Sequence, residues 1–81
     1  MTQNRSSAVM QQRSEPQIDR RQDSLLRIAD VRRRTGLSTA TVYRREAQGT
    51  FPRRQKLGLK SVAWYESDVG EWVADPIGYR A

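Results

Sequence analysis

The sequence predicts a small, mainly helical domain with one β-hairpin, preceded by an N-terminal tail without stable structure. Its 81 residues suffice for at most one small domain. Apolar residues recur at helical spacing in two segments and alternate in a third. Residues 1–23 hold few large apolar side chains, so they cannot bury enough surface to offset the entropy of ordering. We therefore expect a disordered tail over residues 1–23 and a folded domain over residues 24–81.

The first helix is expected over residues 29–36. It follows a short apolar lead-in at residues 25–28, which is either a strand or an extended segment. Ile28, Val31 and Thr35 recur on one face of this helix at helical spacing. The terminal glycine ends it, because glycine tolerates the left-handed conformation at a helix C-terminus.

The second helix is expected over residues 39–48 and is closed by Gly49. Ser38 is a good N-cap, because its hydroxyl can accept from the free amides of the next turn. Leu37, between the helices, is apolar and expected to be buried. Two helices joined by a Gly-Leu-Ser turn make a helix-turn-helix, with Val42 pointing inward against the first helix.

A β-hairpin is expected over residues 53–64, after Pro52 and around a turn at residues 58–61. Val62 and Trp64 alternate, as in a half-buried strand. Basic residues lie on both arms and near the tip. Such a hairpin beside a helix-turn-helix is a wing, and an ordinary charged edge is the alternative.

A last helix is expected over residues 67–75 and is stopped by Pro76. Val69, Trp72 and Val73 follow i, i+3, i+4 spacing, which predicts an apolar face. The two tryptophans could be stacking platforms for bases, but their place on apolar faces favours the core. Four acidic residues could suggest a metal site; charges on a solvated helix are the simpler interpretation. These are Glu66, Asp68, Glu71 and Asp75.

Basic charge is concentrated in one block. Residues 32–60 hold nine Lys and Arg against Glu46 alone, whereas residues 61–81 hold one arginine against four acids. Such a block attracts a polyanion, and DNA carries one charge per ~1.7 Å of its axis. A basic surface without a partner is the alternative.

If the basic block binds double-stranded DNA, the second helix lies in the major groove and its N-terminal part meets the bases. Short hydroxyls at a helix N-terminus suit phosphate, and arginine suits a guanine edge. The residues expected to point outward into the groove are then Thr39, Ala40, Tyr43 and Arg44, with Arg45 beside them. Ser38 and Thr41 are expected to contact phosphates. The wing would follow the backbone or enter the minor groove through Arg53, Arg54, Lys56 and Lys60.

Other function classes are disfavoured by composition. Cysteine and histidine are both absent, which removes thiolate and imidazole metal ligands and the commonest general base. We therefore expect no metal, no cofactor and no enzymatic activity. No run of 18 apolar residues and no apolar leader is present, so we expect a cytoplasmic protein without a membrane segment.

Residues 25–77, approximately, resemble the AlpA family of phage-associated transcriptional regulators, which belong to the winged-helix, MerR-like and excisionase-like group. The most specific parts are GLS with TVYR (36–38 and 41–44), GTFPRRQKLG (49–58), and VAW with ESDV (62–64 and 66–69). The family pattern usually has Arg in place of Lys60 and Gly in place of Ala63, and both changes are mild. The resemblance implies the same groove and wing residues as the pattern of charge.

The resemblance also implies a regulator of transcription, often of an integrase or excision gene. The alternative is an excisionase-like architectural factor that bends attachment-site DNA, and a third class is an adaptor whose basic face meets an acidic protein. MerR-type regulators sense a ligand through a domain that follows the wing. Only four residues follow Ile77, so we expect no effector domain for a small molecule. Self-association on DNA stays open.

Overall fold

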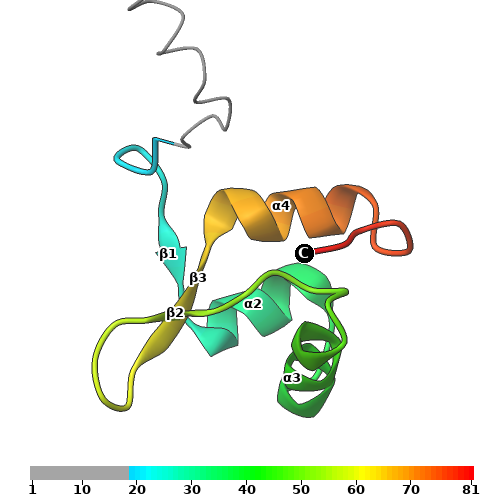
Figure 1. Ribbon diagram of the computed structural model, residues 1–81, viewed down its shortest axis with the longest axis horizontal. Helices are drawn as coiled ribbons and strands as arrows, with labels where there is room; N and C mark the ends of the chain where they lie inside the picture. Colours follow the sequence, from blue (N-terminus) through cyan, green and yellow to red (C-terminus); the bar gives the residue numbers. More distant parts are fainter. Residues whose placement is uncertain (1–18) are drawn as a thin grey trace, which may run out of the picture.

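Two helices, a hairpin and a third helix follow one another in the computed structural model, which describes residues 19–81 (Figure 1). The elements are β1 (Leu25–Leu26), α2 (Ile28–Thr35), α3 (Thr39–Ala47), β2 (Gln55–Lys56), β3 (Val62–Tyr65) and α4 (Glu66–Ala74). This order confirms the predicted winged helix-turn-helix, mainly helical with a small hairpin. Most of the predicted tail, residues 1–18, lies outside the described residues.

The turn between α2 and α3 is formed by Gly36, Leu37 and Ser38, as the sequence predicted. Gly36 has a φ of 77°, and its N–H donates to the carbonyl oxygen of Arg32 at 2.8 Å. The Oγ of Ser38 accepts from the N–H of Thr41 at 3.2 Å and caps α3. Leu37 is half-buried and packs against the core. The helix-turn-helix therefore forms as predicted.

The core is built from apolar side chains of every helix and of β3. Val31 of α2 and Val42 of α3 are fully buried, which fixes these two helices against each other. Trp64 is 0% exposed and Trp72 is 5% exposed, so both are core residues, as predicted. The prediction for Val73 was wrong, since it is 40% exposed. It lies about 100° around the helix from Trp72, beyond the stripe that faces the core.

The segment that joins α3 to the hairpin is buried and held by both tryptophans. The indole Nε1 of Trp72 donates to the carbonyl oxygen of Thr50 at 3.1 Å, and that of Trp64 donates to the carbonyl oxygen of Pro52 at 3.2 Å. Phe51 lies between these two anchors, is fully buried, and has its ring centroid 5.3 Å from that of Trp72. The path from α3 into the hairpin is thus set by the core.

The three strands form one antiparallel sheet in the order β1-β3-β2. The first half of the lead-in is a strand, because Leu25 pairs with Tyr65 and Leu26 pairs with Trp64, whereas Ile28 already begins α2. The prediction that β3 is half-buried with alternating residues was wrong. Ala63 and Trp64 are both fully buried, because β3 is the central strand and the helices α2 and α4 also pack against it.

The N-terminus of α4 is capped by Asp23, which the sequence assigned to the tail, and by Ser24, the first residue of the expected domain. Its own N-cap position carries a tyrosine, which makes no side-chain capping bond. Instead, the Asp23 carboxylate accepts from the Ser67 N–H at 3.2 Å and from the Ser67 hydroxyl at 2.6 Å. The carbonyl oxygen of Ser24 accepts from the Glu66 N–H at 2.8 Å. These contacts satisfy two amides that a helix leaves unpaired at its start.

Arg20 extends the same contact. Its guanidinium donates to the carboxylates of Asp23 at 3.0 Å and Asp68 at 3.3 Å, and lies 4.0 Å from the centroid of the Tyr65 ring. Residues of the expected tail, Arg20 and Asp23, therefore make ordered contacts with α4. Sequence reasoning did not indicate the contact with α4, because Asp68 and Tyr65 lie more than 40 residues from Arg20.

We expect Asp23→Asn to melt at a lower temperature than the unaltered protein at neutral pH, and the difference to shrink in acid. The Ser67 hydroxyl, helped by two backbone amides and Arg20, lowers the pKa of Asp23 to about 2. In the unfolded chain an aspartate has a pKa of about 3.9, so this stabilisation is present above about pH 4 and is lost as the pH falls toward 2.

Thermal melts followed by circular dichroism across this pH range would measure the effect. Glu71→Gln is the matched control, because it alters an exposed carboxylate on α4, the helix that Asp23 caps. This variant should melt at the same temperature as the unaltered protein. A difference for Asp23→Asn that stays constant down to about pH 2 would contradict the assignment.

Candidate nucleic-acid interface

One side of α3 presents a row of polar side chains to solvent. The Ser38 hydroxyl donates to Thr41 Oγ1 at 3.0 Å, and Nη2 of Arg44 donates to the same oxygen at 3.4 Å. Ser38, Ala40 and Arg44 are exposed, whereas Thr39 and Thr41 are half-buried. The row therefore runs from the capped end of the helix through Thr41 to Arg44, which lies about one turn beyond Thr41.

Tyr43 is less accessible than the prediction of an outward-pointing side chain implies. It is half-buried, and its ring centroid lies 6.1 Å from that of Trp64. The guanidinium of Arg54 lies 5.0 Å from the Tyr43 ring on the hairpin side. Because the hairpin folds back beside α3, the tyrosine fills the junction between them.

The two adjacent arginines of α3 have different surroundings. Arg44 is exposed, whereas Arg45 is half-buried with its guanidinium 6.0 Å from the centroid of the Trp72 ring. The Nε of Arg45 is buried and has no hydrogen-bond partner within residues 19–81. Arg44 thus extends into solvent, while Arg45 lies along the edge of the core.

The hairpin presents all four of its predicted wing residues to solvent: Arg53, Arg54, Lys56 and Lys60. Residue pairing across its arms is Gln55 with Ala63 and Lys56 with Val62. The Leu57 N–H donates to the carbonyl oxygen of Ser61 at 2.7 Å, which closes the tip around residues 58–60. The arms are short, so this bond and the contact with α3 set the shape of the hairpin.

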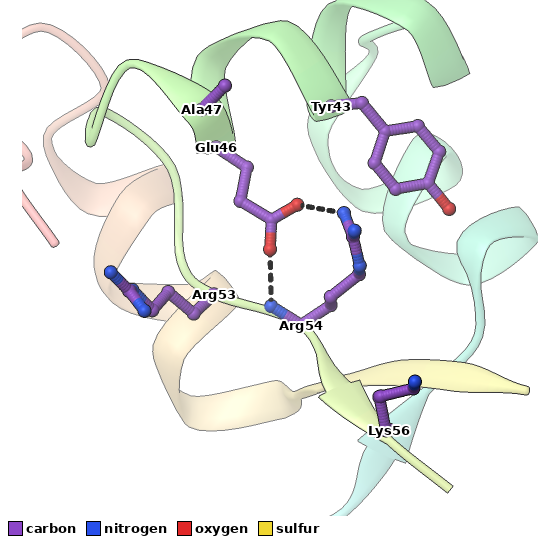
Figure 2. Close-up of a pocket in the computed structure, with 6 residues that line it drawn as sticks. All are labelled: Tyr43, Glu46, Ala47, Arg53, Arg54 and Lys56. Atoms are coloured by element: carbon purple, nitrogen blue, oxygen red, sulfur yellow. Dashed lines mark hydrogen bonds and ion pairs between the residues drawn. The ribbon is translucent and has the colours of Figure 1, made fainter. Parts of the chain in front are cut away.

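A single carboxylate joins the hairpin to α3 (Figure 2). Glu46 accepts from Nη1 of Arg54 at 2.6 Å and from the backbone N–H of Arg54 at 2.7 Å. Its side chain is only 12% exposed. Sequence reasoning missed this residue. The available signal was that Glu46 is the one acid among nine basic residues, which indicates a carboxylate kept for a specific partner.

The charge on this surface is largely unneutralised. On α2, Arg33 pairs with Asp30 and Arg34 pairs with Glu66 at 3.5 Å. Among the described residues, five basic side chains of α3 and the hairpin make no ion pair: Arg44, Arg45, Arg53, Lys56 and Lys60. Both elements project on the side away from α4 (Figure 1), and residues of both line one shallow hollow. The positive potential therefore gathers on one surface.

The described part of the chain holds neither a carboxylate metal site nor a membrane-spanning helix. No group of three or more Asp or Glu side chains lies close enough there to hold a metal ion. Glu66 and Asp68 lie instead in the first turn of α4, where carboxylates suit the helix dipole. None of the helices formed by residues 19–81 has the length and apolar character needed to cross a bilayer.

Residues 24–77 match the family described as Prophage CP4-57 regulatory protein (AlpA). The chain belongs to the AlpA family. The match covers every helix and strand of this AlpA-family domain, from β1 through α4. It confirms the resemblance seen in the sequence motifs.

Two relatives of this AlpA-family chain come from a phage and a bacterium. The uncharacterized protein ORF88 of Enterobacteria phage P4 is 40% identical over 65 residues, which cover 80% of this chain and 74% of the relative. The DNA-binding transcriptional activator AlpA of Escherichia coli (strain K12) is 36% identical over 56 residues, which cover 62% of this chain and 80% of the relative. No solved structure matches the chain.

We expect Glu46→Ala to loosen the hairpin while the domain stays folded. The change removes two hydrogen bonds to Arg54 but leaves the buried side chains in place, so the loss is about 1–2 kcal/mol. Hydrogen exchange of the Leu57 amide, which closes the hairpin, should then accelerate about five- to thirtyfold.

Asp30→Ala is the matched control, because it breaks an exposed ion pair with Arg33 on α2. Exchange at Leu57 should not change in this variant. Equal protection of Leu57 in Glu46→Ala and the unaltered protein would show that the carboxylate does not hold the hairpin.

Proposed function

We propose that this chain is a sequence-specific DNA-binding transcriptional regulator of a phage or other mobile element. The observation that carries the proposal is the pairing of a capped, exposed helix with a basic hairpin on one surface, where five basic side chains lack ion pairs among the described residues. Membership of the AlpA family and the activator named above support it. The proposed role needs no catalysis and belongs in the cytoplasm, where bacterial and phage DNA is located.

In this proposal α3 enters the major groove with its N-terminal half against the bases. Ser38 and Thr41 contact phosphate, because their hydroxyls lie at the capped start of the helix. Thr39 and Ala40 face base edges. Arg44, exposed and one turn further on, reaches a guanine edge with two donors.

The half-buried residues of α3 take more limited roles. Tyr43 packs on Trp64, so only its hydroxyl end is proposed to meet DNA, at the edge of the groove. Arg45 lies against Trp72, and a buried stem with a charged head suits a phosphate better than a base.

The hairpin is proposed to grip the backbone beside the groove occupied by α3, or to enter the adjacent minor groove. Arg53, Lys56 and Lys60 are exposed and without ion pairs in the described chain, so their charge is available to phosphate. Arg54 has a second task, because its pair with Glu46 keeps the hairpin at a fixed distance from α3.

An excisionase-like architectural factor is the second candidate, favoured by an apolar residue, Leu59, at the tip of the basic hairpin. A reporter assay and an excision assay on the same host DNA would separate the two roles. Self-association on DNA is compatible with both. An adaptor that binds an acidic protein would show no binding to DNA that falls steeply with salt.

We expect the purified protein to bind duplex DNA with an affinity that falls steeply with salt. If four to six phosphates are contacted, the slope of log K against log salt should be about −4 to −5. Titrations at several salt concentrations, with a duplex selected from a random pool, would measure it. A flat response would refute the nucleic-acid proposal.

We expect Arg44→Ala and Lys60→Ala to weaken binding in different ways. Loss of a base contact by Arg44 should cost about 1–3 kcal/mol on the selected site and relax the preference at one position. Loss of a phosphate contact by Lys60 should weaken all sequences equally and reduce the salt slope by about one.

Both variants should be measured on the selected site, on single-base mismatches and on random DNA. Arg21→Ala is the control, because this exposed arginine is ion-paired with Asp19 and belongs to neither α3 nor the hairpin. Uniform weakening by Arg44→Ala together with altered base preference in Lys60→Ala would reverse the two roles.

A further inference from the structure

The tip of the hairpin carries an apolar side chain that the domain does not use for packing. Leu59 is 94% exposed, the highest value among the large apolar residues of the described chain. It is the central residue of the tip that is closed by the bond between Leu57 and Ser61. Because its side chain lies almost wholly in water, it adds nothing to the core.

The surroundings of Leu59 indicate what could cover it. Lys60 follows it directly, Lys56 lies at the end of β2, and residues 47–65 contain no acidic side chain. Leu59 is an apolar side chain with the cations Lys56 and Lys60 near it. It would fit a partner whose apolar surface lies between two rows of negative charge. Stacked bases between two phosphate backbones have this arrangement, whereas a protein partner would need an apolar pocket with an acidic rim.

The position of the tip also fits contact with a duplex. Leu59 and Lys60 line a shallow hollow together with Tyr43 and Ala47 of α3, so the tip lies beside this helix. Figure 1 shows the hairpin loop and α3 projecting on the same side, away from α4. A duplex that receives α3 in one groove therefore lies within reach of the tip.

We propose that Leu59 inserts between two base pairs from the minor groove and kinks the DNA, while Lys56 and Lys60 contact the flanking phosphates. Leucine is one of the residues that act as apolar wedges in this way, with bends of about 20–90°. Steps of pyrimidine followed by purine unstack most easily, so the hairpin should select such a step without contacting its base edges. This inference rests on the proposed DNA binding and adds a specific action to the hairpin.

The test measures bending and unstacking separately from affinity. A duplex selected from a random pool carries a donor and an acceptor dye at its ends, and a second copy carries 2-aminopurine at the step nearest the hairpin. The unaltered protein should bring the dyes closer and raise the 2-aminopurine fluorescence. Leu59→Ala should abolish both signals and leave the salt slope unchanged. Affinity should fall by less than about tenfold, because the variant loses the apolar contact but no longer has to unstack the two base pairs.

Two further variants complete the comparison. Leu59→Met keeps a long apolar side chain and should retain the bend, whereas Leu57→Ala removes a neighbouring leucine below the tip and should leave the bend unchanged. The melting temperature of Leu59→Ala should equal that of the unaltered protein, because the side chain is 94% exposed.

The outcomes distinguish this inference from the proposed function. If the unaltered protein binds the duplex but produces neither signal, or if Leu59→Ala bends DNA as the unaltered protein does, the wedge is refuted and DNA binding stands. If the unaltered protein does not bind duplex DNA, both proposals fail. If Leu59→Ala changes only the association of the protein with itself, the tip is a contact between copies and the wedge is refuted.

Discussion

Two indole hydrogen bonds to the segment between α3 and the hairpin set how these two elements are placed relative to each other. Trp64 and Trp72 donate to backbone carbonyls on either side of Phe51, which is fully buried. The segment is fixed by hydrogen bonds at Thr50 and Pro52, and the buried ring of Phe51 lies between them. It therefore has little freedom to change direction. The helix before it and the hairpin after it therefore leave the core along fixed paths, although neither is long enough to be stable alone.

The Glu46–Arg54 contact continues this constraint outside the core. It joins the last turns of α3 to the first residues of the hairpin, and Tyr43 packs against the same arginine. A carboxylate in a basic surface weakens attraction to a polyanion. Glu46 is only 12% exposed, and its two hydrogen bonds to Arg54 explain why a carboxylate lies here. These bonds hold α3 and the hairpin together.

The distribution of charge follows from the same arrangement. Acidic residues gather on α4, where Asp23 and Arg20 reach from the N-terminal segment to complete the start of the helix. Among the described residues, Arg44, Arg53, Lys56 and Lys60 make no ion pair and lie on α3 and the hairpin, two elements that project away from α4 (Figure 1). Separation of this kind orients a small domain toward an anionic partner, and it leaves the apolar Leu59 at the tip of the basic side.

Local signals in the sequence determined the order of the elements, the turn at Gly36, the cap at Ser38 and the basic block, because each depends on residues within a few positions of one another. The tryptophans were also placed correctly in the core from their spacing. Of the site, the sequence predicted the exposed position of Arg44 and of the four basic hairpin residues.

Only the tertiary structure decided how these parts meet. The pairing of β1 with β3, the cap that Asp23 places on α4, and the orientation of Tyr43 and Arg45 all depend on partners distant in the chain. Periodicity shows which face of an element is apolar, but not which neighbour covers it. A residue at the edge of that face, such as Tyr43 or Val73, is buried or exposed according to the element packed beside it, and that is a property of the assembled fold.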